Sequence, residues 1–224
     1  MTVTGVVPVV IELWADLICP WCYLGKHRLE AAIAQRGDAD RFRVWQRSFE
    51  LDPNASSEAE GVLEHLGHKY GVGPEQVAQM EGRVASLAVA DGLPYSNDRV
   101  TANSFDTHRL QHYAAAEAPD IDFFGAVQDA YFAGTLNPFD PEQLVAAAVA
   151  AGLDADGVRA VLAGDDYADA VRADEAEARA LGASGVPFTV YARRYAVSGA
   201  QSTETFAQVL AQTAATVDEG LATS

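Results

Sequence analysis

Residues 14–25 read Trp-Ala-Asp-Leu-Ile-Cys-Pro-Trp-Cys-Tyr-Leu-Gly and hold both cysteines of the chain, Cys19 and Cys22. The residues just before them, 9–14, are mostly apolar and partly β-branched, which predicts a strand buried on both faces. Pro20 suits the first turn of a helix, because its missing N–H is one that a helix leaves unpaired. Cys19 then lies at the helix N-terminus, which favours a thiolate, and Cys22 projects from the same face within reach of a disulfide.

Two other interpretations of the cysteine pair are weaker. A structural zinc site needs two further ligands, and the sequence has no second Cys-x-x-Cys motif. The pairs His65 with His68 and His108 with His112 do not belong to a recognisable metal motif either. Two inert core cysteines are the other alternative. We therefore expect a redox dithiol, with no metal and no cofactor.

The charge of the chain argues against several partners. Its 224 residues include 15 basic and 32 acidic side chains, which give a formal net charge of −17. Such an excess repels nucleic acid and anionic membrane surfaces. The first eight residues lack the basic segment of a signal peptide, and no apolar run is long enough to span a bilayer. We expect a cytoplasmic protein, in which a dithiol is more often catalytic than structural.

The order of elements predicts an α/β protein. A helix from Pro20 to about residue 35 and an alternating strand at 41–49 complete one β-α-β unit. Residues 52–182 are Ala-rich and read as six or seven helices. Two strands, 188–192 and 195–198, and a helix from about 202 to 217 follow. This order predicts a thioredoxin fold, residues 1–51 and 183–224, with a large all-helical subdomain, 52–182, inserted in it.

The motif Cys-Pro-Trp-Cys-Tyr-Leu-Gly, the segments 184–189 and 195–201 and the helical insert together resemble the DsbA-like oxidoreductases of the FrnE branch. That branch is related to the 2-hydroxychromene-2-carboxylate isomerases and the kappa-class glutathione transferases. The resemblance implies a cis peptide bond between Val186 and Pro187, in a loop that faces the dithiol. It also implies that residues 103–110 form a helix near the site, so that His108 could shape a substrate groove; the alternative is a histidine on the helix surface or in helix packing.

The expected roles follow from thiol chemistry. Cys19 is the exposed nucleophile that attacks a substrate disulfide, and Cys22 resolves the resulting mixed disulfide. The side chains and backbone expected to contact substrate are those of Pro20, Trp21, Val186, Pro187 and His108.

Predictions also follow for one acidic residue and for the three tryptophans. Glu12, on the first strand, is a candidate to exchange protons with Cys22 if it is buried with a raised pKa; the alternative is that it reaches water. Trp14 and Trp45 are expected to pack in the core, whereas packing beside the dithiol is the alternative for Trp21.

The sequence therefore predicts a thiol-disulfide oxidoreductase acting on protein or small-molecule thiols and disulfides, glutathione among them. The first alternative is a glutathione-dependent isomerase or transferase acting on a small aromatic compound. Relatives of that kind carry serine at the nucleophile position, whereas this chain keeps both Cys19 and Cys22. The second alternative is a binding module that holds clients in a helical groove.

Overall fold

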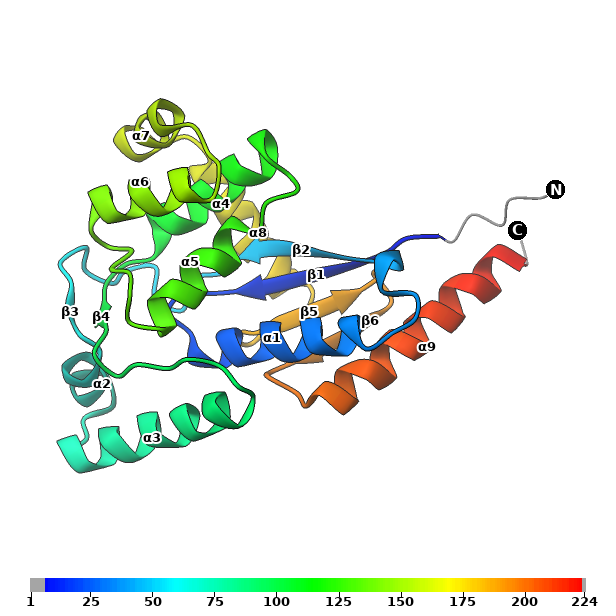
Figure 1. Cartoon of the computed structure of the whole chain (residues 1–224), viewed down its shortest axis with the longest axis horizontal. Helices are drawn as coiled ribbons and strands as arrows, with labels where there is room; N and C mark the ends of the chain where they lie inside the picture. The colour runs from blue at the N-terminus through cyan, green and yellow to red at the C-terminus, as the bar shows by residue number, and fades with distance from the viewer. Residues whose placement is uncertain (1–6, 223–224) are drawn as a thin grey trace.

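A computed structural model describes residues 7–222 of the chain. The segment 1–6, on which part of the expectation about a signal peptide depends, lies outside the described residues. A four-stranded sheet forms the centre, in the order β2-β1-β5-β6 (Figure 1). β1 pairs with β2 in parallel and with β5 antiparallel, and β5 pairs antiparallel with β6. The strands are β1 Val9–Ala15, β2 Phe42–Ser48, β5 Phe188–Tyr191 and β6 Tyr195–Ser198.

Helices cover both faces of this sheet. α1 (Pro20–Ala34) and α9 (Thr203–Ala222) pack against each other on one face, where Ile11 and Phe206 belong to a shared apolar cluster. α8 (Ala168–Ala180) packs on the other face, against β2, and its Ala178 lies in a cluster with Trp14. α8 falls within the range predicted for the insert, yet it serves as a layer of the sheet. The thioredoxin-like α/β fold is confirmed.

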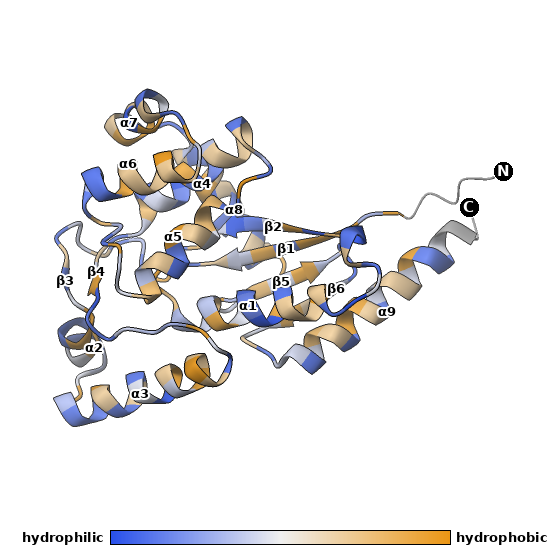
Figure 2. Ribbon diagram, in the orientation of Figure 1, coloured by the Kyte–Doolittle hydropathy of each residue, from blue (hydrophilic) through white to orange (hydrophobic). Residues whose placement is uncertain are grey.

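Six more helices gather beyond the carboxyl ends of β1 and β2 (Figure 1). The ribbons of these helices alternate between hydrophobic and hydrophilic residues along their length, as is typical of helices with one face in a core (Figure 2). With α8, they make seven helices between residues 52 and 182, within the expectation of six or seven. The six are α2 Val62–Tyr70, α3 Pro74–Ala90, α4 Phe105–Glu117, α5 Phe123–Phe132, α6 Pro141–Ala150 and α7 Ala155–Ala163.

Two details of the prediction are wrong. The insert is not all-helical, because β3 (Glu60–Gly61) and β4 (Val100–Thr101) pair as a small antiparallel sheet. Two residues are too few to show the alternation by which a strand is recognised. Trp45 is 53% exposed rather than buried in the core, because β2 is the outermost strand of its sheet. Trp14 is fully buried, as expected.

The loop that joins β1 to α1 is where the sheet meets the insert. Leu17, Cys19 and Cys22 pack in one apolar cluster with Leu110 of α4 and Phe124 of α5. This cluster therefore holds the dithiol between the sheet and the helical insert. Among residues 7–222, no helix is long and apolar enough to cross a membrane.

Candidate active site

The dithiol lies at the start of α1, as predicted. Cys19 is the N-cap residue, with φ −81° and ψ 113°, and Pro20 occupies the first turn. The Cys22 N–H donates to the Cys19 carbonyl oxygen at 3.0 Å, and both residues are free thiols. The prediction of an exposed Cys19 is wrong for this structure: Cys19 is only 3% exposed and Cys22 not at all, because the helical insert packs over the loop.

The peptide bond between Val186 and Pro187 is cis, as the family resemblance implied. The Cys19 thiol donates a hydrogen bond to the Val186 carbonyl oxygen, at 3.8 Å from Sγ. The loop also touches α1 at Gly25, where a Cβ atom would lie 2.9 Å from Pro187 Cγ. Val186 and Pro187 thus lie directly beside the sulfur expected to react first.

Trp21 is the large side chain of the motif that reaches the surface, with 38% of its area exposed. Pro20, before it, is half-buried. Both residues occupy the first turn of α1 beside the almost covered Cys19. Their placement agrees with the expected contacts to substrate, which stay a prediction.

The environment of Cys22 disfavours its thiolate. Burial is the largest cause of a pKa raised well above the ordinary value for cysteine, followed by the hydrogen bond and the charge interaction with Cys19. A hydrogen bond from the backbone of Asp16 acts in the opposite direction, and the Asp16 charge raises the pKa further. Cys22 is therefore a neutral thiol at neutral pH, and its proton must leave before or during any attack by its sulfur.

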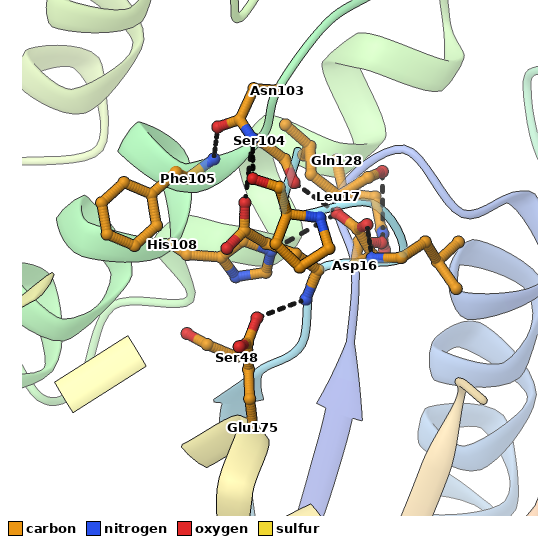
Figure 3. A network of polar contacts seen from close by, with 12 residues as sticks. Asp16, Leu17, Ser48, Asn103, Ser104, Phe105, His108, Gln128 and Glu175 are labelled. Atoms are coloured by element: carbon orange, nitrogen blue, oxygen red, sulfur yellow. Dashed lines mark hydrogen bonds and ion pairs between the residues drawn. The ribbon is translucent and has the colours of Figure 1, made fainter. Parts of the chain in front are cut away.

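A polar network is centred on the fully buried Asp16, in the loop between β1 and α1 (Figure 3). One carboxylate oxygen, Oδ1, accepts from Ser104 Oγ at 2.7 Å and lies 3.3 Å from His108 Nε2. The other, Oδ2, accepts from the Leu51 N–H at 2.7 Å. Gln128 Nε2 donates to the Asp16 carbonyl oxygen at 3.1 Å, which fixes the backbone of the same residue.

His108 takes the helix-packing alternative and not a place in a substrate groove. It lies on α4, as expected, but its ring is completely buried beside Phe124, with 5.4 Å between the ring centroids. Its Nδ1 atom has no hydrogen-bond partner, and its Nε2 faces Asp16. His108 is thus not on the surface of a groove in this structure, because α4 turns this face of the helix into the core.

Glu12 is buried, with 2% exposure, but the structure does not bring it to the dithiol. Its carboxylate forms ion pairs with Arg47, at 2.7 Å, and with Arg193. The next residue, Leu13, shares the apolar cluster of Cys22, and neighbouring residues of a strand point to opposite faces. Glu12 therefore projects toward the α8 face of the sheet, so that the expected proton exchange with Cys22 has no contact to support it.

Asp16 is a buried carboxylate whose charge raises the pKa of Cys22, and sequence reasoning assigned it no role in proton exchange. Its position in a strand-to-helix loop is typical of a solvated aspartate. The sequence does show that Asp16 lies three residues before Cys19. Its hydrogen-bond and ion-pair partners, Leu51, Ser104 and His108, are distant in sequence, so its burial could not be predicted. Only the packing of α4 against the loop shows that its side chain points inward.

Two free thiols at a helix N-terminus, on a thioredoxin-like sheet and facing a cis-proline loop, define a thiol-redox type of site. The DSBA-like thioredoxin domain family matches residues 10–211. The chain therefore belongs to this family of DsbA-like thioredoxin-fold oxidoreductases.

Solved structures agree with this assignment. A probable DsbA oxidoreductase from Streptomyces coelicolor is 46% identical, with a TM-score of 0.86 over 92% of this chain and 89% of that one. A 2-hydroxychromene-2-carboxylate isomerase is 16% identical, with a TM-score of 0.63 over 96% and 99% of the two chains.

A third structure, the cytosolic disulfide reductase DsbM from Pseudomonas aeruginosa with GSH, is 19% identical, with a TM-score of 0.56 over 95% and 98%. Likenesses at such low identities, for DsbM and for the isomerase, show the fold alone. No curated protein matches the chain significantly.

Proposed function

We propose that this protein is a thiol-disulfide oxidoreductase in which Cys19 attacks and Cys22 resolves. The observation that carries the proposal is the contrast between the two thiols. Cys19 caps α1 and contacts the Val186 carbonyl oxygen, beside the exposed Trp21, whereas Cys22 is fully buried with a raised pKa. A substrate can therefore approach Cys19 first, and Cys22 can react only with a sulfur already bonded to Cys19.

The reaction takes place in two exchange steps. The Cys19 thiolate attacks one sulfur of a substrate disulfide, a Cys19–substrate disulfide forms, and the other substrate sulfur leaves with the electron pair. Cys22 then loses its proton and attacks the Cys19 sulfur. A Cys19–Cys22 disulfide forms and the second substrate sulfur leaves as a thiolate, so that the substrate is reduced and the dithiol oxidised. The reverse sequence oxidises a substrate dithiol.

Substrate contacts would come from the two segments that flank Cys19. Trp21 offers an amphipathic surface, and the backbone of Val186 can pair with an extended substrate, in the manner of strand addition. Both protein disulfides and glutathione fit this chemistry, and a fold relative, DsbM, has been solved with GSH. That relative is cytosolic, which supports a cytoplasmic location as part of the proposal.

The test uses the two single-cysteine variants. With a disulfide-containing client or with oxidised glutathione, Cys22→Ser should accumulate a mixed disulfide on Cys19, whereas Cys19→Ser should accumulate none. Mass spectrometry of acid-quenched samples measures both. Equal trapping by the two variants would contradict the order of attack. Glutathione-dependent turnover of a small aromatic substrate that persists when both cysteines are serine would favour the isomerase or transferase alternative instead.

A further inference from the structure

A cavity of about 590 Å³ opens between α1, β2 and the segment that joins α4 to α5. Its volume is that of a site for a small molecule. Among the described residues, those that line it include neither cysteine, nor Trp21, Val186 or Pro187, which lie around Cys19. The cavity is therefore separate from the site of thiol exchange.

One part of the cavity is apolar. Leu13 of β1 and Leu29 of α1 are buried there, and Ile121, just before α5, is half-buried. Val44 of β2 also lines the cavity, and part of its side chain is exposed because β2 is the outermost strand of the described sheet. An apolar group placed against these side chains would be removed from water, which favours binding.

Carboxylates dominate the charged part of the lining. Lys26 Nζ lies 3.0 Å from Glu30 Oε1 and 3.2 Å from Asp122 Oδ2, and the lysine side chain is only 9% exposed. One ammonium group is thus shared by two carboxylates, and the exposed Asp120 adds a third acidic side chain. The excess of negative charge in a cleft attracts a cation and repels an anion.

Two basic residues that also line the cavity already face carboxylates outside it. Arg47 pairs with Glu12 at 2.7 Å and with Asp174 at 3.1 Å. His112 Nε2 lies 3.2 Å from Asp174 Oδ2 and 3.2 Å from Ser48 Oγ. The buried Nε of Arg47 has no partner among the described residues, and such a donor would favour an anion, so an anionic probe belongs in the test.

Gln111 of α4 supplies an acceptor for a cationic ligand. It lines the cavity, and the described part of the chain offers its buried Oε1 atom no hydrogen-bond partner. A buried carbonyl oxygen without a partner is unfavourable, and an N–H donor of a ligand would satisfy it. An ammonium group has such donors together with the positive charge that the acidic side chains attract, whereas a carboxylate has neither.

We propose that this cavity binds a small organic cation, an ammonium group attached to an apolar body. The ammonium group donates to Gln111 Oε1 and is attracted by Asp120, and the apolar body packs against Leu29 and Val44. This inference goes beyond thiol exchange and does not depend on it, because a ligand in the cavity contacts neither cysteine.

Three probes of similar shape and different charge test the proposal. Benzylammonium is positive, benzyl alcohol is neutral and phenylacetate is negative. In calorimetric titrations we expect benzylammonium to bind about tenfold more tightly than benzyl alcohol, because charge strengthens its hydrogen bond, and phenylacetate to bind most weakly. The preference should shrink at high salt, which screens the acidic side chains. In NMR spectra the indole signal of Trp45, which lines the cavity, should shift, and that of Trp21 should not.

The chain supplies matched variants on one helix. Ala115 of α4 is exposed and lines the cavity, so Ala115→Phe should fill it and abolish binding. Ala116, also exposed, does not line the cavity, and Ala116→Phe should bind benzylammonium as the wild type does. Gln111→Leu removes the acceptor and Asp120→Asn removes a charge, so each should narrow the preference for the cation several-fold.

The possible outcomes are distinct. Equal affinities for the three probes, a preference for phenylacetate, or no binding at millimolar concentrations would overturn the proposal, and so would binding that Ala115→Phe leaves unchanged. A variant with both Cys19→Ser and Cys22→Ser should still bind benzylammonium, and loss of binding there would place the ligand at the dithiol instead. Binding that persists in a wild type unable to exchange disulfides would support the cation site and refute the proposed function.

Discussion

Gly25 and Pro187 are in van der Waals contact across the boundary between α1 and the loop that faces the dithiol. A Cβ atom on Gly25 would lie 2.9 Å from Pro187 Cγ and 3.4 Å from the backbone of Ala200. The first distance is shorter than carbon atoms tolerate, and a proline ring has little freedom to move aside. A residue without a side chain at position 25 therefore allows the loop to approach the same helix that carries Cys19.

The first prediction is that Gly25→Ala destabilises the protein and displaces the loop. The added methyl group must push Pro187 away from α1, which should cost about 1–3 kcal/mol of the free energy of unfolding, as for other overpacked sites. Because Val186 O would move away from Cys19 Sγ, reaction with oxidised glutathione should change as well. Urea denaturation and the rate of mixed-disulfide formation measure the two effects.

Gly82 is the control for this variant. It lies inside α3, where an added Cβ would meet no atom within 4 Å. Gly82→Ala should therefore gain up to about 1 kcal/mol, because alanine is the better helix former. The interpretation of Gly25 fails if Gly25→Ala is as stable as the wild type.

The second prediction concerns selective alkylation. In the reduced protein at neutral pH, iodoacetamide should modify Cys19 before Cys22, because Cys22 is fully buried and its pKa is raised. Peptide mapping by mass spectrometry after short labelling times identifies the modified residue, and labelling in denaturant confirms that both thiols are otherwise equally reactive. Preferential modification of Cys22 would reverse the proposed order.

The third prediction separates Glu12 from the thiol chemistry. Glu12→Gln removes a buried charge from Arg47 and Arg193, whose side chains are partly exposed, at 24% and 50%. We expect a loss of about 1–3 kcal/mol in stability, less than for a fully buried pair because water screens both arginines. The rates of mixed-disulfide formation and resolution should stay close to those of the wild type. A selective loss of resolution would restore Glu12 as a proton carrier.

The features that could be predicted from the sequence are those encoded by residues close together in the chain. The dithiol, the strand before it and the helix after it are encoded within residues 9–25, so pattern and turn chemistry were sufficient. The Val186–Pro187 loop is distant in sequence and was predicted only because several segments together resemble a family. Neither the local pattern nor the family resemblance predicted that the side chain of Asp16 is buried. Its partners, on α4 and after β2, are brought to it by tertiary packing. Trp45 was misjudged because the sequence pattern does not show that β2 is an edge strand.

The last prediction is a pH dependence of stability that depends on Cys22. Burial, followed by Cys19, raises the pKa of Cys22 in the folded protein, whereas in the unfolded chain its pKa is about 8.5. Below that pH Cys22 is protonated in both states, and its contribution to stability is fully present. As the pH rises toward the folded pKa, only the unfolded chain releases the proton, so folding loses about 1.4 kcal/mol per pH unit from this group.

Urea denaturation under reducing conditions, at pH values between about 7.5 and 10, measures this loss of stability. The range spans the pKa of an unfolded cysteine thiol, about 8.5. The reduced wild type should lose stability more steeply above about pH 8.5 than Cys22→Ser, which lacks the titrating thiol but keeps all other ionisable groups. The difference between the two proteins reports on Cys22 together with its interaction with Cys19, because the groups that do not contact Cys22 contribute equally to both. Parallel stability profiles over this range would mean that folding does not shift the Cys22 pKa, and that the two thiols do not differ in the way that the proposed order of attack requires.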